Sequence, residues 1–181
     1  RQRQMCIRDS AYAGEDLDLG DGRVLLEPRT LAKMLDTLDL GPDELVMDVG
    51  CGYGYSAAVI ARLAQAVIAV EEDEAMAGEA QALLSEAGAD NAVVHQGPLA
   101  EGADEHGPYD VIIVEGGIEE VPAPLIAQLK DGGRMACLFM QGALGEVRIG
   151  YKSGGTLTWR FEFNAAAPVL PGFGRERAFT L

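Results

Sequence analysis

Short, nearly unbroken runs of apolar residues alternate along the chain with stretches in which apolar residues recur every three or four positions. Unbroken runs are typical of parallel strands covered on both faces, and the wider spacing is typical of helices packed on them. Strands are expected at residues 45–49, 66–70, 92–95, 109–114 and 134–140, and helices at residues 28–40, 55–64, 73–87 and 121–130. Residues 142–151 and 156–163 follow as an expected antiparallel pair. This order predicts a doubly wound α/β sheet, mostly parallel, with helices on both faces.

The strand at residues 45–49 ends at three glycines spaced by two, Gly50, Gly52 and Gly54. Glycine has no Cβ, so the backbone can bend sharply here and approach a ligand closely. A dinucleotide-binding turn would have its third glycine one residue later, where the chain has Tyr55. A phosphate-binding P-loop would need a Gly-Lys-Ser/Thr sequence, which does not follow these glycines. The turn is therefore typical of a nucleotide-binding sheet but matches neither of these phosphate sites.

Two carboxylates indicate the ligand of this turn. Asp48 precedes the glycines, where it would repel an anion and suits a ligand that carries an ammonium group. Glu71 closes the next strand, where a carboxylate can accept hydrogen bonds from both ribose hydroxyls. S-adenosylmethionine carries an ammonium, a sulfonium and a ribose, so this set predicts a site for it. The alternative is a tight turn without a ligand, with Glu71 at a solvated strand end.

The two ends of the chain differ from this core. Residues 1–10 are basic, lack an initiator methionine and resemble a translated adapter remnant, so we expect a non-native leader with no part in the fold. Residues 11–181 are expected to form one domain. It would comprise a loop and helix over the site (11–43), an S-adenosylmethionine-binding core (44–141), and C-terminal strands with an irregular tail (142–181).

The charge balance narrows the classes of partner. The chain has 29 acidic and 14 basic residues and a formal net charge of −15. Such a charge disfavours nucleic acid and anionic membrane surfaces, and no apolar run approaches the length needed to span a bilayer. Cys6, Cys51 and Cys137 share no metal-type spacing, so we interpret them as reduced hydrophobic residues of a cytoplasmic protein. His95 and His106 are expected to be structural or solvated, and no metal site is predicted.

Longer motifs give a more specific resemblance. Residues 46–60, Val-Met-Asp-Val-Gly-Cys-Gly-Tyr-Gly-Tyr-Ser-Ala-Ala-Val-Ile, are similar to the first motif of protein-L-isoaspartate O-methyltransferases. Further matches are Tyr-Asp-Val-Ile-Ile-Val at 109–114, Val-Pro at 121–122 and Leu-Lys-Asp-Gly-Gly-Arg at 129–134, within a likeness that covers about residues 11–145. The resemblance implies a Rossmann-like methyltransferase that uses S-adenosylmethionine. Its substrates would be damaged proteins, which it would methylate on the carboxylate of isoaspartyl residues.

The resemblance also implies roles for particular residues on the donor side. The glycines would line the methionine part of S-adenosylmethionine, Asp48 would hold its ammonium group through water, and Glu71 would take the ribose. The expected donor-binding set is completed by neighbours in the same segments: Cys51, Tyr55, Glu72, Gly97 and Pro98. At Gly97-Pro98 the family commonly has Gly-Asp, whose carboxylate accepts from the adenine amino group, so that contact is lost or comes from elsewhere.

Three positions on the acceptor side depart from the family pattern. Leu26 stands where a serine helps to place the isoaspartyl carboxylate, and leucine cannot donate a hydrogen bond. Glu27 would repel an anionic substrate if it faced the site. Glu115 ends the fourth strand, where small or hydroxyl residues are usual, and would act as a catalytic or substrate-orienting group or point to solvent. We take Leu26, Glu27 and Glu115 as the candidate catalytic positions.

The chemistry needs no general base, because a carboxylate acceptor is already ionised at neutral pH. Three other functions stay open at this point. One is a methyltransferase of the same fold with a different acceptor, which Leu26, Glu27 and Glu115 favour. Another is a non-catalytic module that binds S-adenosylmethionine or a partner. The last is a nicotinamide-dependent oxidoreductase, which the early third glycine and Tyr55 disfavour.

Overall fold

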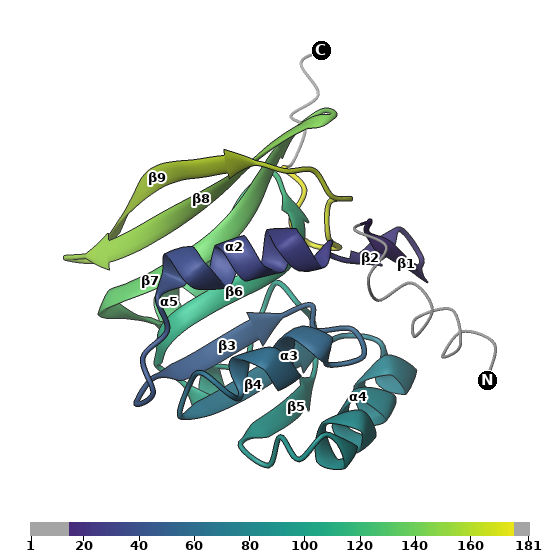
Figure 1. Ribbon diagram of the computed structural model, residues 1–181. Coiled ribbons are helices and arrows are strands. Elements are labelled where there is room, and N and C mark those ends of the chain that lie inside the picture. Colours follow the sequence, from purple (N-terminus) through teal and green to yellow (C-terminus); the bar gives the residue numbers. More distant parts are fainter. Residues whose placement is uncertain (1–14, 176–181) are drawn as a thin grey trace.

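The fold comes from a computed structural model that describes residues 15–175. The expected leader, Cys6 and residues 176–181 lie outside the described residues. Within residues 15–175 the sheet has seven strands in the order β5-β4-β3-β6-β7-β8-β9 (Figure 1). They are β3 Leu45–Val49, β4 Ala66–Glu71, β5 Ala92–Gln96, β6 Tyr109–Ile118, β7 Leu129–Gln141, β8 Leu144–Ser153 and β9 Thr156–Asn164.

The expected fold class is confirmed. Strands β5, β4, β3, β6 and β7 are parallel, and β8 and β9 continue the sheet as antiparallel strands beside β7. Strands β3, β4 and most of β6 are buried on both faces, which explains their unbroken apolar sequences, whereas the edge strand β5 is partly exposed. The strand order reverses between β3 and β6, and in open α/β sheets ligands bind outside the carboxyl ends of the strands at such a point.

Helices cover both faces of the sheet. On one face, residues of α2 (Pro28–Leu38), α3 (Tyr55–Ile60) and α4 (Glu74–Glu86) share a hydrophobic core with Val46, Val67 and Val111. On the other face, Leu125 of α5 (Ala123–Gln128) packs with Met47 and Ile112. A short 3-10 turn, η1 (Asp104–His106), precedes β6. No helix within residues 15–175 is long and apolar enough to cross a membrane.

Helix α2 forms where the apolar spacing predicts it. Its buried side chains are Leu31, Met34, Leu35 and Leu38, which recur along one face. Its C-terminal end is fixed by Arg134 of β7, whose guanidinium donates to the carbonyl oxygens of Leu38 and Asp39 and pairs with Glu44 at 2.7 Å. Because carbonyls at a helix end lack partners within the helix, these bonds hold α2 against the sheet.

Several element boundaries differ from the sequence-based expectation. Within the segment expected to be a loop, residues 17–25 form a two-stranded hairpin, β1 (Leu17–Gly20) and β2 (Arg23–Leu25). Asp21 adopts a positive φ between two glycines that do the same, so a tight turn is possible there. Helices α3 and α5 end earlier than expected, at Ile60 and Gln128. Strands β6 and β7 are longer, so Glu115 lies inside β6 and not after it.

Candidate functional site

Three buried carboxylates lie at the carboxyl ends of three neighbouring strands. Asp48 of β3 pairs with Ala69 of β4 and with Ile113 of β6. Because side chains alternate along a strand, Glu71, two residues beyond Ala69, points to the same face of the sheet as Asp48. Glu115 lies where the pairing of β6 with β7 shifts register, and it is close enough to Asp48 for the two charges to interact. Asp48 and Glu71 are 0% exposed and Glu115 is 3% exposed. The doubly wound topology thus gathers three acidic groups at one point of the edge.

Glu71 is fully engaged within the protein. Both of its oxygens accept from the guanidinium of Arg23 in β2, one of them at 2.8 Å from Nη2. The backbone N–H groups of Gly52 and Asp73 also donate to this carboxylate, at 2.8 and 3.1 Å. Burial lowers the pKa of Arg23, but the hydrogen bond and the charge of Glu71 outweigh it and raise the pKa. The idea of a solvated strand end at Glu71 is therefore wrong.

Among residues 15–175, only one of the two carboxylate oxygens of Asp48 has a hydrogen-bond partner. Its Oδ2 accepts a hydrogen bond of 2.6 Å from the Ser56 hydroxyl of α3, whereas Oδ1 is buried and has no partner among residues 15–175. Burial raises the pKa of Asp48 to about 7, the hydrogen bond from Ser56 opposes this rise, and the charge of Glu71 adds to it. The orphan oxygen marks a place where a hydrogen-bond donor is expected.

Glu115 has no hydrogen bond on either carboxylate oxygen within the described part of the chain. Burial, and after it the charge of Asp48, raises the pKa of Glu115 well above its ordinary value. A fully buried carboxyl without a partner is costly, and buried polar groups in proteins are normally hydrogen-bonded. Glu115 is therefore unusual among the side chains of this edge.

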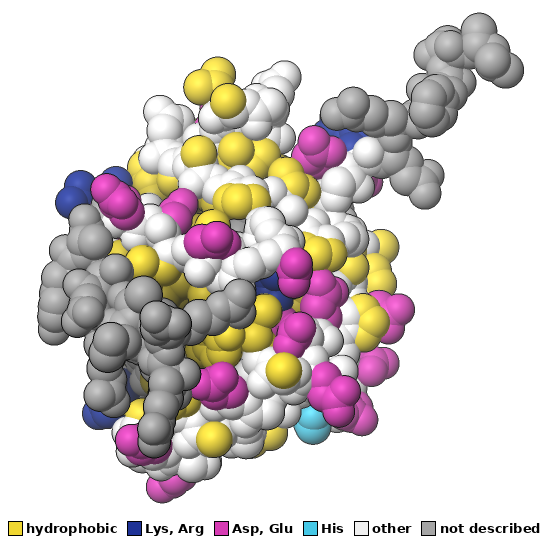
Figure 2. Space-filling model, turned by 90° about the vertical axis from the view of Figure 1, so that its right-hand side faces the viewer, with side chains coloured by type: hydrophobic (Ala, Val, Ile, Leu, Met, Phe, Trp, Pro, Cys, Tyr) yellow, Lys and Arg dark blue, Asp and Glu magenta, His cyan; other side chains and the backbone are white. Residues whose placement is uncertain are grey.

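The hairpin and a C-terminal segment close over the glycine turn. A Cβ placed on Gly52 would lie 2.9 Å from Leu19 of β1. A Cβ on Gly50 would lie 3.5 Å from Nη2 of Arg23 and 3.6 Å from Leu170, which follows β9. Gly50 and Gly52 have positive φ values of 85° and 56°, which favour glycine, and the contact at Gly52 is tighter than a Cβ normally makes. The turn is thus a cradle that the protein's own side chains fill in this structure. The face that carries the hairpin also has Asp and Glu side chains gathered over one half (Figure 2).

The other predicted donor residues lie around this cradle. Cys51 is 1% exposed, and burial raises the pKa of its thiol. Tyr55 is 46% exposed at the start of α3, and Glu72 is half-buried after β4. The backbone N–H of Gly97 donates to the carbonyl of Glu71, which places the Gly97-Pro98 step beside the same strand ends.

The predicted acceptor residues do not form one group. Leu26 is 1% exposed and belongs to the hydrophobic core with α2 and α3. Glu27 lies just before α2, and its carboxylate is 3.5 Å from the guanidinium nitrogen of the exposed Arg29. Glu115 is brought together with Asp48, on the side of the glycine turn. Arg23 was missed by sequence reasoning, although it is the single basic residue between residues 11 and 28.

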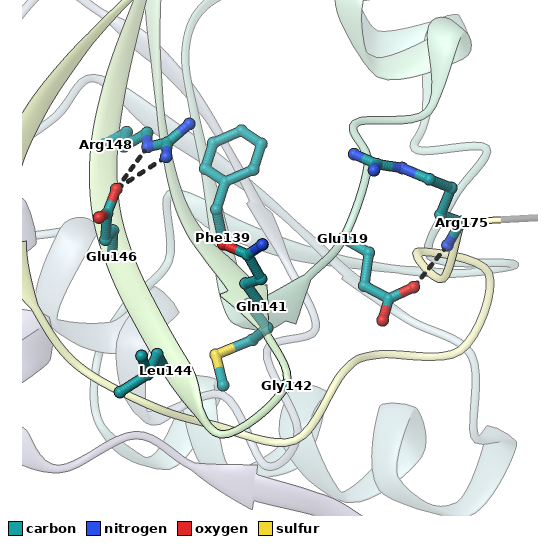
Figure 3. Close-up of a pocket in the computed structure, with 9 residues that line it drawn as sticks. Glu119, Phe139, Gln141, Gly142, Leu144, Glu146, Arg148 and Arg175 are labelled. Atoms are coloured by element: carbon teal, nitrogen blue, oxygen red, sulfur yellow. Dashed lines mark hydrogen bonds and ion pairs between the residues drawn. The ribbon is translucent and has the colours of Figure 1, made fainter.

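A separate cavity of about 510 Å³ lies at the carboxyl end of β7 (Figure 3). Arg148 and Glu146 of β8 form an ion pair of 2.7 Å on one side of it, and Glu119 accepts from the backbone N–H of Arg175 on the other. Phe139 of β7 lies between them. The cavity thus combines an aromatic wall with two cations and two carboxylates.

His95 and His106, the two histidines of the chain, meet at Glu105. One ring nitrogen of each lies 3.3 Å from the same carboxylate oxygen. A structural zinc site normally has four protein ligands, and these three groups are half-buried or exposed. We assign no metal to this cluster.

Comparison with known proteins gives one family. A family model described as Protein-L-isoaspartate(D-aspartate) O-methyltransferase matches residues 2–143. The protein-L-isoaspartate O-methyltransferase of Roseiflexus castenholzii is 39% identical over 71% of this chain and 59% of its own length. Protein-L-isoaspartate O-methyltransferase 2 of a Polaromonas species is 42% identical over 69% of this chain and 59% of its own length. This chain therefore spans less than two thirds of these relatives.

Comparison with solved structures gives matches to proteins of the same name. A protein-L-isoaspartate O-methyltransferase structure matches with a TM-score of 0.79 and 26% identity, over 87% of this chain and 52% of the other. A putative enzyme of the same kind from Plasmodium falciparum, in complex with S-adenosyl-L-homocysteine, matches with a TM-score of 0.75 and 19% identity. That second match covers 93% of this chain and 85% of the other, and it supports the fold alone.

Proposed function

Since this chain belongs to the protein-L-isoaspartate O-methyltransferase family, we propose that it transfers a methyl group from S-adenosylmethionine to a carboxylate of isoaspartyl residues in damaged proteins. The partner would be an isoaspartyl protein or peptide, and the location cytoplasmic. The acceptor carboxylate is ionised at neutral pH, so the protein need not supply a general base.

The observation that carries this proposal is the group formed by Asp48, the glycine turn and Glu71 at the point where the strand order reverses. The buried, partnerless Oδ1 of Asp48 suits the ammonium group of the donor. The glycine cradle suits a ligand that approaches the backbone closely. Cys51 and Tyr55 would line the same turn, Glu71 and Glu72 would face the ribose, and Gly97 and Pro98 the adenine. The residues present thus fit the donor.

When bound, S-adenosylmethionine supplies an electrophilic methyl group on a sulfonium. The residues of this chain would bind and orient the two reactants and exclude water. Leu19 and Leu170, which already cover the glycine turn, are placed to keep water out. The acceptor oxygen gains the methyl group, the carbon–sulfur bond breaks with its electrons left on sulfur, and the products are a methyl ester and S-adenosylhomocysteine.

Donor binding has a structural condition in this protein. The carboxylate of Glu71 accepts from Arg23 on both oxygens, so a ribose could take these positions only after the guanidinium has moved. Arg23 lies on a hairpin whose two strands pair only with each other, so the hairpin can shift without breaking the seven-stranded sheet. We therefore include a movement of β1 and β2 in the proposed binding step.

A methyltransferase with a different acceptor is the second candidate function. The burial of Leu26 favours it, because the position given to a hydroxyl in the family here holds an apolar side chain packed in the core. Under the first proposal, the acceptor carboxylate would have to be held by other groups. Arg148 and Arg175, which line the cavity beside β7, are the cations available there.

The test measures methyl transfer from labelled S-adenosylmethionine to an isoaspartyl peptide, with the matching aspartyl peptide as the control. Donor binding is followed in parallel by calorimetry. Selective labelling of the isoaspartyl peptide supports the proposed function. Donor binding without transfer to either peptide favours the second candidate, and the absence of donor binding overturns both.

A further inference from the structure

Three buried oxygens at the carboxyl edge of the sheet have no hydrogen-bond partner within residues 15–175. They are Oδ1 of Asp48 and both carboxylate oxygens of Glu115. The two residues lie on adjacent strands, where the charge of Asp48 acts on Glu115 and the carbonyl oxygen of Glu115 lies 3.8 Å from a Cβ placed on Gly50. Both are buried, so bulk water does not satisfy them. An unsatisfied group of this kind in a native structure needs an explanation, and an absent ligand is one.

The charges around these oxygens indicate the sign of that ligand. Asp48, Glu71 and Glu115 are three potential anions, and the charge of each acts on the thiol of Cys51 in the glycine turn. The cation among them is Arg23, whose guanidinium is already paired with Glu71. Within residues 15–175, Asp48 and Glu115 therefore share no cation of their own. An anionic ligand would be repelled here, whereas a cation would be attracted in a region of low dielectric.

We propose that Glu115 is a donor-binding residue, and that Asp48 and Glu115 together hold the α-ammonium group of S-adenosylmethionine. This inference rests on the proposed function and deepens it. A primary ammonium has three N–H donors, and the site offers three unpartnered oxygens. Its sequence position suggested a role at the methyl acceptor, whereas this inference assigns Glu115 to binding of the donor.

The alternative role for Glu115, at the methyl acceptor, fits the structure less well. Its carboxylate would repel the acceptor carboxylate if ionised, and its side chain is buried beside Asp48 and not exposed to an incoming peptide. The backbone of Glu115 also approaches the glycine turn, since its carbonyl oxygen lies 3.8 Å from a Cβ placed on Gly50. Side chain and backbone both put Glu115 next to the segment proposed to take the methionine part of the donor.

The test compares two ligands by calorimetry: S-adenosylhomocysteine, which carries the α-amino acid group with its ammonium and carboxylate, and 5′-methylthioadenosine, which lacks both. In the unchanged protein we expect tighter binding of S-adenosylhomocysteine. Glu115→Gln should weaken that ligand by about 10- to 100-fold, the range typical of a hydrogen bond to a charged group, and leave 5′-methylthioadenosine unchanged. The exposed Glu120→Gln, five residues along the chain, is the matched control and should alter neither affinity.

A second readout measures the release of protons when the ligand binds. Burial raises the pKa of Asp48 and of Glu115, so the free site holds protons that an incoming ammonium would displace. The facing groups are Arg23 from β2, Glu71 from β4 and Cys51 from the turn. Binding of S-adenosylhomocysteine near pH 7, measured in buffers of different ionisation enthalpy, should release protons, and Glu115→Gln should release fewer.

Each of four results overturns the inference. Equal weakening of both ligands by Glu115→Gln, with an unchanged circular dichroism spectrum, means that Glu115 only supports the fold of the site. No weakening of either ligand means that Glu115 does not contact the ammonium. Unchanged binding with loss of methyl transfer places Glu115 on the acceptor side and leaves the proposed function intact. If the unchanged protein binds neither ligand, the proposed function fails and this inference fails with it.

Discussion

The guanidinium of Arg23 and the carboxylate of Glu71 form a two-point ion pair that is buried beneath the β1–β2 hairpin. The two residues are 48 positions apart, and their side chains are 5% and 0% exposed. The pair joins the hairpin to the end of β4, and Gly52 in the glycine turn donates to the same carboxylate. This pair, together with Leu19 over Gly52, closes the hairpin over the site, and it occupies the group proposed to bind the ribose.

Removal of Arg23 should destabilise the ligand-free protein. Arg23→Met leaves Glu71 as a buried carboxylate without its cation, and breaking a buried pair in this way costs about 3–5 kcal/mol. The double variant Arg23→Met/Glu71→Gln removes the uncompensated charge and should recover much of that loss. The free energy of unfolding, measured by urea denaturation, checks both expectations.

The matched control for this prediction is Arg29→Met. The Arg29 side chain is 78% exposed and 3.5 Å from Glu27, so its loss should change stability by less than about 0.5 kcal/mol. Equal effects of the two single variants would show that the Arg23–Glu71 pair does not hold the hairpin in place.

The thiol of Cys51 should report on opening of the hairpin. Cys51 is 1% exposed and burial raises its pKa, so alkylation should be slow in the native protein. Arg23→Met should speed alkylation of Cys51, whereas Cys137, buried inside β7, should stay protected. Peptide mass spectrometry in a Cys6→Ser background gives the two rates. If both thiols accelerate together, the variant loosens the whole domain and not the hairpin alone.

Stability should fall as the pH rises from about 5 to 7. The pKa of Asp48 is about 7 in the folded protein and close to 4 in an unfolded chain, so the folded state holds a proton that the unfolded state has released. The raised pKa of Glu115 acts with the same sign. Glu44 and Asp110 have lowered pKa values, so their contribution is lost only when the pH falls below about 4 to 5.

The measurement is the unfolding free energy of ligand-free protein at several pH values. Asp48→Asn should reduce the fall in unfolding free energy between pH 5 and 7 by on the order of a few kcal/mol. Asp43→Asn, which alters an exposed carboxylate five residues away, should keep the slope of the unchanged protein. A slope that survives Asp48→Asn would assign the proton to another group.

Most of the fold could be predicted from the sequence, because parallel strands buried on both faces leave an unbroken apolar signal that Val46, Ile112 and their neighbours carry. The family resemblance is confirmed for the same reason, since the glycine turn and its flanks are local motifs. The hairpin was missed because residues 17–25 form a short, acidic segment rich in turn residues, and its place over the site depends on contacts with distant residues, such as Arg23–Glu71. The placement of Glu115 also depends on strand register, which sequence spacing alone does not give.

Gly54 tests how tightly the glycine turn is packed against α4. Gly54 and Gly88 both have positive φ, 82° and 67°, so alanine is strained at either position by about 1–2 kcal/mol. A Cβ at Gly54 would lie 3.2 Å from Leu84 and 3.5 Å from Ala80, both in α4, whereas a Cβ at Gly88 meets nothing within 4 Å. Gly54→Ala should therefore destabilise the protein by about 1–3 kcal/mol more than Gly88→Ala, because α4 has to shift. Gly54 immediately precedes α3, and Ser56 of that helix donates to Asp48. The same substitution should therefore weaken binding of S-adenosylhomocysteine, and Gly88→Ala should not. Equal losses of stability in the two variants, measured by urea denaturation, would mean that α4 yields without cost and that backbone strain is the whole effect.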